Sequence, residues 1–167
     1  TSNYWSLEVD DWTLRFKGRT SGGTFDLNSG ESAQNQWRHA AVTVRADSIL
    51  LYVDGNLEAA VTRPDGDLST GVRTWVGVDG VVVPIGDNRL TGSVYDLRIW
   101  SQPQVQLDIK NNIWEIVNTS RISGLSALYE MSAGSGTSVY DRSGNDNSMA
   151  IYGDAAWSNE VPVSYPT

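Results

Sequence analysis

Seven consecutive residues, from Asp141 to Asn147, carry the densest set of side chains that could hold a metal ion. The oxygen donors in this stretch belong to Asp141, Ser143, Asn145, Asp146 and Asn147, with a glycine between them that permits a sharp turn. Hard oxygen ligands in a flexible loop suit Ca²⁺. The same residues also suit an Asx-type turn, in which side chains bond to the loop's own backbone. Both hypotheses are open: a calcium site with these five ligands, and a hydrogen-bonded turn.

Side chains for nucleophilic or zinc-dependent catalysis are scarce. The chain has one histidine, His39, and no cysteine, so a cysteine–histidine pair and a histidine-rich zinc site are excluded. A Ser-His-Asp triad would have to use His39, which falls within a predicted strand. We therefore expect a protein that is not an enzyme.

Tryptophan supplies the other candidate chemistry, because an exposed aromatic ring can stack on the apolar face of a ligand while its rim stays polar. The chain has seven Trp. Trp75 stands beside a Gly- and Asp-rich stretch, residues 78–88, and Trp157 stands near the C-terminus, so both are candidates for an exposed ligand platform. The polar groups assigned to the same ligand site are Asp79, Asp87 and Asn88. The tryptophans expected to be buried in strands are Trp12, Trp37 and Trp100.

Composition and charge narrow the class of protein. The 167 residues suit about one domain, and 40% of them are hydrophobic, which excludes a disordered chain. The net charge is −8 and the 12 Lys and Arg form no cluster, so nucleic acid is a poor candidate partner. No apolar run approaches the roughly 18 residues of a membrane span.

Alternating apolar and polar residues predict strands that would position these groups. Residues 37–44 and 51–61 form an antiparallel meander, in which Asp54 and Gly55 make a type I′ turn. Residues 5–9 and 12–17 form a second pair, with Trp12, Leu14 and Phe16 on one buried face. Further strands are expected at residues 73–78 and 95–99.

One short helix is expected near residues 103–117. Pro103 stands in its predicted first turn, and Val105, Ile109, Ile113 and Ile116 draw one apolar stripe along it. We expect this helix to lie across a sheet edge or at the end of a sandwich.

Three blocks of the sequence resemble laminin G-like domains, which are concanavalin A-like jelly rolls related to pentraxins. The first joins W-R-H-A-A-V-T-V at residues 37–44 to L-Y-V-D-G at residues 51–55. The second is L-T-G-S-V-Y-D-L-R-I-W at residues 90–100, and the third is D-x-S-G-N-x-N at residues 141–147. The resemblance implies an all-β, antiparallel β-sandwich, with residues 1–167 forming a single laminin G-like domain.

The resemblance also bears on chemistry. Loops similar to residues 141–147 bind calcium in some members of this family. Related folds include glucanases, which use paired carboxylates. Glu8, Asp10 and Asp11 are the nearest match to such a pair, but a second Glu is lacking.

The order of the blocks departs from the family pattern. A strand such as residues 125–131 and the D-x-S-G-N loop usually come first, whereas here they come last, and no segment of the sequence resembles the two strands that normally follow them. Three explanations are open. The chain is the C-terminal part of a longer protein, it is a compact variant, or a strand from another copy or protein completes the sandwich. For the last case we expect residues 158–167 to be the exchanged element, with residues 1–9 as the alternative.

These observations lead to one expected function and two alternatives. We expect a lectin-like, non-catalytic binding or adhesion module in an extracellular, cell-surface or virion-surface setting. Its expected partner is a glycan or a surface protein, and Ca²⁺ is the candidate cofactor. The first alternative is a self-assembling structural subunit of a filament, sheath or virion surface, and the second is a glycan-cleaving enzyme.

Overall fold

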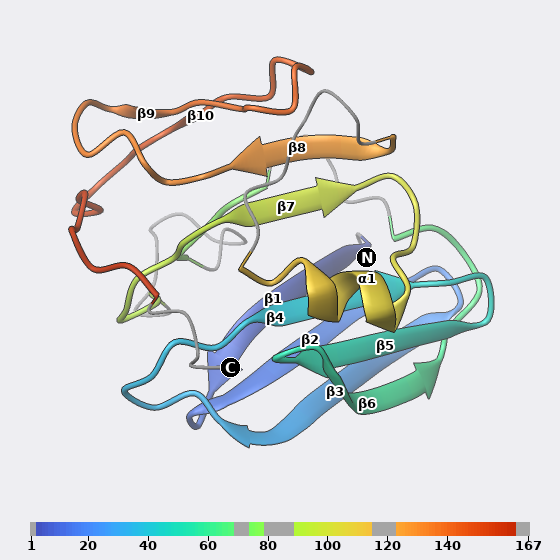
Figure 1. Cartoon of the computed structure of the whole chain (residues 1–167). Helices are drawn as coiled ribbons and strands as arrows, with labels where there is room; N and C mark the ends of the chain where they lie inside the picture. Colours follow the sequence, from blue (N-terminus) through green and yellow to red (C-terminus); the bar gives the residue numbers. More distant parts are fainter. Residues whose placement is uncertain (1–2, 69–73, 79–88, 115–122, 163–167) are drawn as a thin grey trace. The chain divides into compact units, whose positions relative to one another are not determined.

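The computed structural model describes residues 3–68, 74–78, 89–114 and 123–162 (Figure 1). The chain divides into two compact units. The first comprises residues 1–91 and 103–113, and the second comprises residues 92–102 and 114–167. Each unit is described below by itself, and the single-domain assignment stays a prediction.

One sheet of the first unit is the antiparallel array β1 (Tyr4–Asp10), β2 (Thr13–Thr20) and β3 (Gly23–Ser32). Leu14 and Phe16 are buried as predicted, with 8% and 4% of their surface exposed. The prediction for Trp12 is wrong, because this residue lies in the β1–β2 turn and is 54% exposed. Asp11 and Trp12 have φ of 46° and 65°, the left-handed values that a two-residue hairpin turn requires.

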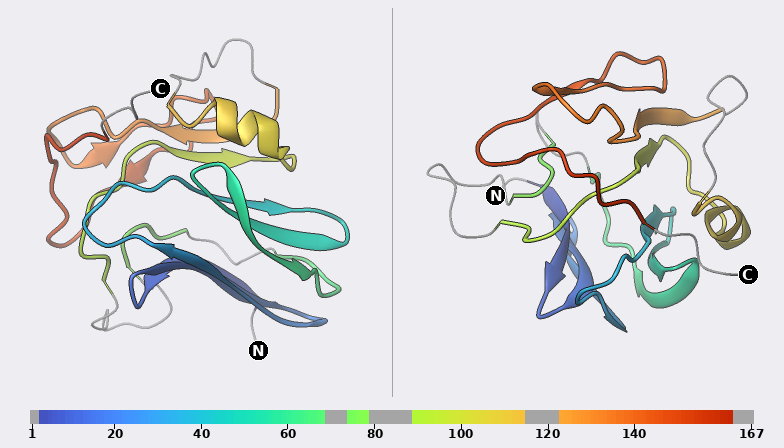
Figure 2. Two further views of the ribbon diagram at one scale, coloured as in Figure 1. Left: turned by 60° about the horizontal axis from the view of Figure 1, so that its bottom comes forward. Right: turned by 60° about the vertical axis from the view of Figure 1, so that its left-hand side comes forward.

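The predicted meander is confirmed as a second three-stranded sheet. It consists of β4 (Ala40–Val44), β5 (Ser48–Val53) and β6 (Asn56–Thr62), in that spatial order. Asp54 and Gly55 have φ of 49° and 77°, as a type I′ turn requires. In Figure 2, the blue strands β1–β3 form one layer and the cyan and green strands β4–β6 form the other.

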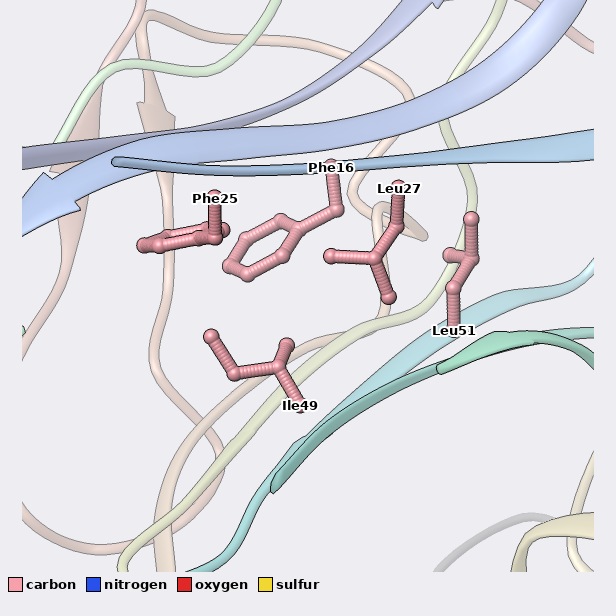
Figure 3. Packing of buried hydrophobic residues seen from close by; sticks show 5 residues of the cluster. All are labelled: Phe16, Phe25, Leu27, Ile49 and Leu51. Carbon is pink, nitrogen blue, oxygen red and sulfur yellow. The ribbon is translucent and has the colours of Figure 1, made fainter. Parts of the chain in front are cut away.

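The main core of the first unit lies between these two layers. Phe16, Phe25 and Leu27 point from β2 and β3 toward Ile49 and Leu51 of β5, and all five are at most 5% exposed (Figure 3). The rings of Phe16 and Phe25 stack with their centroids 5.3 Å apart. Side chains that are less deeply buried complete the packing: Val42, Val44, Ala59, Val61 and Leu68. The unit is therefore a two-layer β-sandwich.

The opposite face of the meander is covered by the helix α1 (Gln106–Asn111). Its Ile109 packs with Leu50 and Tyr52 of β5. The helix is shorter than the predicted 103–117: it begins after Val105, and Asn112 ends it, while residues 115–117 lie outside the described part of the chain. Val105 is 52% exposed, so the predicted apolar stripe is wrong at its first position.

The second unit contains two antiparallel strand pairs. β7 (Leu97–Trp100) pairs with β8 (Leu125–Tyr129), and β9 (Ser138–Val139) pairs with β10 (Met149–Ala150). Its larger buried cluster is Ala127, Tyr129 and Val139. Trp100 is half-buried and packs against Leu125 and Leu128, which partly matches its predicted burial, and Trp37 is also half-buried.

Two predicted strands differ from the structure. Residues 74–77 form no strand, and Val78 makes only an isolated antiparallel bridge with Arg89. The strand expected at 95–99 begins at Leu97, because Asp96 has a φ of 52° that interrupts an extended chain. In the tail, residues 158–162 form no strand and residues 163–167 lie outside the described part of the chain.

In the described part of the chain, the regular structure is thus almost entirely antiparallel β-sheet with one short helix, which confirms the predicted fold class. Among the described residues, no helix is long and apolar enough to cross a membrane.

Candidate functional site

The Asp141 side chain is the centre of the loop between β9 and β10. Its Oδ1 accepts hydrogen bonds from the backbone N–H groups of Leu128 at 3.0 Å and Ser143 at 2.8 Å. Its Oδ2 lies 3.0 Å from the backbone N of Asn147 and 2.9 Å from Ser143 Oγ, and it accepts from both. The hydrogen bond from the backbone N–H of Ser143 to the carboxylate of Asp141, two residues earlier, forms an Asx turn. The turn hypothesis therefore describes the geometry of this loop.

These contacts set the ionisation of Asp141. Partial burial raises the pKa of the carboxyl group, because it removes water from the charged form. Hydrogen bonds from the backbone of Leu128, Ser143 and Asn147, and from the Ser143 hydroxyl, outweigh that effect and lower the pKa to about 2. The side chain is therefore a carboxylate throughout the physiological pH range.

The side-chain amides of two exposed loop residues bond to β8. Asn145 Nδ2 donates to Leu125 O at 2.9 Å, and Asn147 Nδ2 donates to Ser126 O at 3.0 Å. Ser126 has no partner in β7, because the register shifts there between Ile99 and Trp100. The Ser126 carbonyl, at this irregularity of the ladder, is thus bonded by a loop side chain.

The remaining predicted calcium ligand, Asp146, is exposed and has a φ of 60°. Among the described residues, no group of three or more His, Cys, Asp or Glu side chains is placed to hold a metal ion. The calcium site stays a prediction for this loop.

The structure describes only part of the predicted ligand platform. Trp75 is 41% exposed, as expected, but Asp79, Asp87 and Asn88 lie outside the described residues. Trp157 is half-buried: it packs against the cluster around Tyr129, and its Nε1 donates to Gly136 O at 2.8 Å. The Trp157 ring is thus less exposed than a fully open platform, and its assignment to a ligand site stays a prediction.

The groups considered for catalysis make structural contacts. The backbone N of His39 donates to Asp54 Oδ1 at 2.9 Å, which ties the start of β4 to the I′ turn. Glu8 pairs with Lys17 of β2 at 2.6 Å, and Asp10 pairs with Arg15. These are cross-strand ion pairs on one sheet face.

A shallow hollow in the second unit was not predicted from the sequence. It is lined by Glu130, Met131, Ser132, Ala133, Val139, Tyr140, Arg142 and Trp157. Tyr140 stands out because 61% of its surface is exposed, although it directly follows the buried Val139. Strand alternation through Val139 is the signal that could have placed Tyr140 on the outer side.

Comparison with known proteins agrees with the β-sandwich fold. A family model described as the concanavalin A-like lectin/glucanases superfamily matches residues 1–110. No curated protein sequence matches the chain. A crystal structure of a "putative carbohydrate binding protein" from Bacteroides ovatus is similar in fold, with a TM-score of 0.62 and 16% sequence identity. The match covers 95% of this chain but 51% of that one, so the chain spans about half the length of its structural neighbour.

Proposed function

We propose, because the chain belongs to the concanavalin A-like lectin/glucanases superfamily, that it is a non-catalytic binding module whose ligand is a carbohydrate. The single observation that carries this proposal is the superfamily match over residues 1–110. This range holds most of the sandwich unit and also residues 92–102 of the second unit. The Bacteroides ovatus structure supports it through its fold and its description as carbohydrate binding. Fold alone does not assign a function, so the ligand class is the part of the proposal that needs testing.

The absence of catalysis is also part of this proposal. Glu8 and Asp10 are the acids nearest to a glycosidase pair, and each is bonded to a cation across the strand pair. An extracellular, cell-surface or virion-surface location belongs to the same proposal, because surface glycans are then accessible. Calcium bound at residues 141–147 would be an addition to this function and is not required by it.

A binding assay tests the proposed function. The purified chain is applied to an immobilised panel of neutral and acidic polysaccharides, with and without millimolar calcium, and release of reducing ends is followed over time. We expect saturable retention on at least one polysaccharide and no release of reducing ends. Retention on none of them contradicts carbohydrate binding, and steady release of reducing ends identifies a glycan-cleaving enzyme instead.

The apolar face of β1 favours a second candidate function, self-association. Leu7 lies opposite Phe16 and Val9 lies opposite Leu14, so these side chains share the core-facing side of the sheet. They nevertheless remain 42% and 41% exposed, and Trp5 beside them is 38% exposed. A long apolar edge strand without Pro, Lys or a bulge is open to pairing with another strand.

A second copy of the chain is the occupant that suits this strand. Antiparallel pairing of β1 with itself, centred on Leu7, would place Trp5 opposite Val9 and Ser6 opposite Glu8. No like charges would then meet, and the apolar stripe would continue into the partner. We expect a contact larger than about 1,000 Å², the usual scale of a biological interface.

Light scattering across a range of concentrations tests this second candidate. Leu7→Lys should convert a dimer into a monomer, because an edge lysine opposes strand addition. Leu57→Lys is the matched control, since Leu57 is 48% exposed on another edge strand, β6. Deletion of residues 158–167 tests the predicted exchange through the tail. A wild type that is monomeric at every concentration contradicts both forms of self-association.

A further inference from the structure

The β1–β2 turn holds a bulky side chain in a backbone conformation that favours glycine. Among the described residues, seven non-glycine residues have left-handed φ, and five of them are Asp or Asn, which tolerate it. The two exceptions are Trp12, with a φ of 65°, and Met131, with a φ of 54°. Met131 packs against the buried cluster around Tyr129, whereas Trp12 belongs to no buried cluster of the described residues and is 54% exposed. Packing therefore offsets the backbone strain at Met131 but not at Trp12.

The other I′ turn of the first unit has glycine at the same position. It joins β5 to β6 through Asp54 and Gly55, and the φ of Gly55 is 77°. The β1–β2 turn has the same pattern of left-handed φ but places Trp12 where the other turn has Gly55. A left-handed L-residue lowers stability where glycine does not, so the fold of the hairpin gives no reason for a tryptophan here. Strain that no packing offsets indicates a functional contact.

The turn presents the Trp12 indole on an anchored backbone. Ala33 N donates to Trp12 O at 2.6 Å, which ties the turn to the end of β3. On the other side of the turn, Thr13 Oγ1 donates to Asp10 O at 2.8 Å, and the Asp10 carboxylate pairs with Arg15. Trp12 is also the most exposed of the seven tryptophans. A ligand can therefore bury this ring without first ordering the turn.

Size and charge limit what the indole can bind. An aromatic side chain buries about 150 to 250 Å², which is well below the roughly 800 Å² per partner of a stable protein–protein interface. The indole therefore matches one ring of a ligand rather than a protein surface. Asp10 and the exposed Asp11 precede Trp12, and the chain has a net charge of −8, so anionic ligands are disfavoured.

We propose that Trp12 is the stacking platform for one sugar ring of a neutral glycan. The indole covers an apolar C–H face of the sugar, and the Asp11 carboxylate accepts hydrogen bonds from the sugar hydroxyl groups. This inference rests on the proposed carbohydrate-binding function and gives it a place within residues 1–110, the range that the family model matches.

Two substitutions of Trp12 separate binding from folding. Trp12→Gly removes both the ring and the strain, whereas Trp12→Phe keeps an aromatic ring. Tyr152→Ala is the control, because Tyr152 is a 72% exposed aromatic residue of the second unit. Binding to neutral and acidic polysaccharides is measured by calorimetry, stability by urea denaturation and mass by light scattering. The indole N–H resonance that Trp12→Phe lacks is followed by NMR in the wild type.

We expect the wild type to bind a neutral polysaccharide and to shift the Trp12 indole resonance on binding. Trp12→Gly should weaken binding at least tenfold, about 1.4 kcal/mol. Its urea midpoint should nevertheless equal or exceed that of the wild type, because glycine relieves the left-handed strain. Trp12→Phe should bind more tightly than Trp12→Gly, and Tyr152→Ala should bind like the wild type.

Four outcomes would overturn the Trp12 platform. Unchanged neutral-glycan binding by Trp12→Gly, or binding of acidic polysaccharides alone, overturns it and leaves the proposed function intact. Lost binding together with a lower urea midpoint also overturns it, because Trp12 would then act through the fold of the hairpin. A smaller mass of Trp12→Gly in light scattering overturns it in favour of a contact between copies of the chain. Binding of no polysaccharide by the wild type overturns both proposals.

Discussion

The core of the first unit and the Asp141 loop of the second are held by different forces. In the core, Phe16, Leu27 and Leu51 are at most 4% exposed and interact by non-directional apolar packing. In the loop, most side chains are exposed, and directional hydrogen bonds converge on Asp141. The stability of the core should therefore depend on the volume of its side chains, whereas the stability of the loop should depend on charge and on single acceptor atoms.

The largest effect should come from Leu51→Ala, because Leu51 is fully buried between the two sheets. We expect a loss of about 2 to 5 kcal/mol in the free energy of unfolding, measured by urea denaturation. Leu57→Ala is the matched control, since 48% of Leu57 is exposed. Equal losses in the two variants would contradict the packing of β5 against β2 and β3.

Removal of the loop's central acceptor should have the next largest effect. Asp141→Ala leaves the backbone N–H groups of Leu128, Ser143 and Asn147 without this acceptor. We expect a loss of about 2 to 3 kcal/mol, the scale of hydrogen bonds to a charged group. Asp146→Asn removes an exposed carboxylate from the same loop and keeps a residue type that tolerates the left-handed φ of 60°, so it should stay within about 0.5 kcal/mol of the wild type.

Lowering the pH should reduce the contribution of the Asp141 loop to the free energy of unfolding. The pKa of Asp141 is lowered from 3.8 to about 2 in the folded protein, so the unfolded state binds its proton first as the pH falls. The stabilisation is therefore complete above pH 3.8 and is lost as the pH falls through about 2. The difference in unfolding free energy between the wild type and Asp141→Asn should shrink over this window. A constant difference would show that ionisation of Asp141 does not stabilise the loop.

A glycine comparison measures the contact between the I′ turn and the helix. A Cβ on Gly55 would lie 2.9 Å from Lys110 Cα, whereas a Cβ on Gly77 would have no neighbour within 4 Å among the residues that the structure describes. Both residues have left-handed φ, of 77° and 81°. Each alanine variant should lose about 1 to 2 kcal/mol through backbone strain, and Gly55→Ala should lose more. Equal melting temperatures of the two variants would place α1 away from the turn.

The smallest expected effect concerns calcium. Hydrogen bonds from within the unit already occupy both oxygens of Asp141, so the turn hypothesis predicts the same melting curve in millimolar calcium and in EDTA. Calcium at a free concentration of 100 times its dissociation constant would add about 2.7 kcal/mol to the free energy of unfolding. Such a rise, abolished in Asp141→Ala, would establish the calcium site in place of the turn as the loop's function.

The sequence predicted the elements that depend on local pattern. The meander from Ala40 to Thr62 follows from alternation and from the turn preference of Asp54 and Gly55. The error at Trp12 has a local cause, because the alternating pattern continues into a turn that takes left-handed φ at Asp11 and Trp12. Apolar periodicity also overestimated the length of α1, since Val105 has an extended backbone and is the N-cap that precedes the helix.

The candidate site was less predictable because it depends on pairings between distant residues. The composition of residues 141–147 fits both metal binding and a turn, and only the positions of Leu125 and Ser126 in β8 show where the loop amides bond. The hollow beside Tyr140 also requires Trp157 to pack against Val139. Neither contact has a signature in the sequence.

The two-sided burial of β5 has a consequence for the motions of the first unit. Ile49 and Leu51 face the opposite sheet, Leu50 and Tyr52 face α1, and β4 and β6 pair with both edges of the strand. The amide hydrogens of this strand are then exposed to water only when the whole unit opens. Their exchange with deuterium should be the slowest in the unit, and its rate reports the free energy of that global opening.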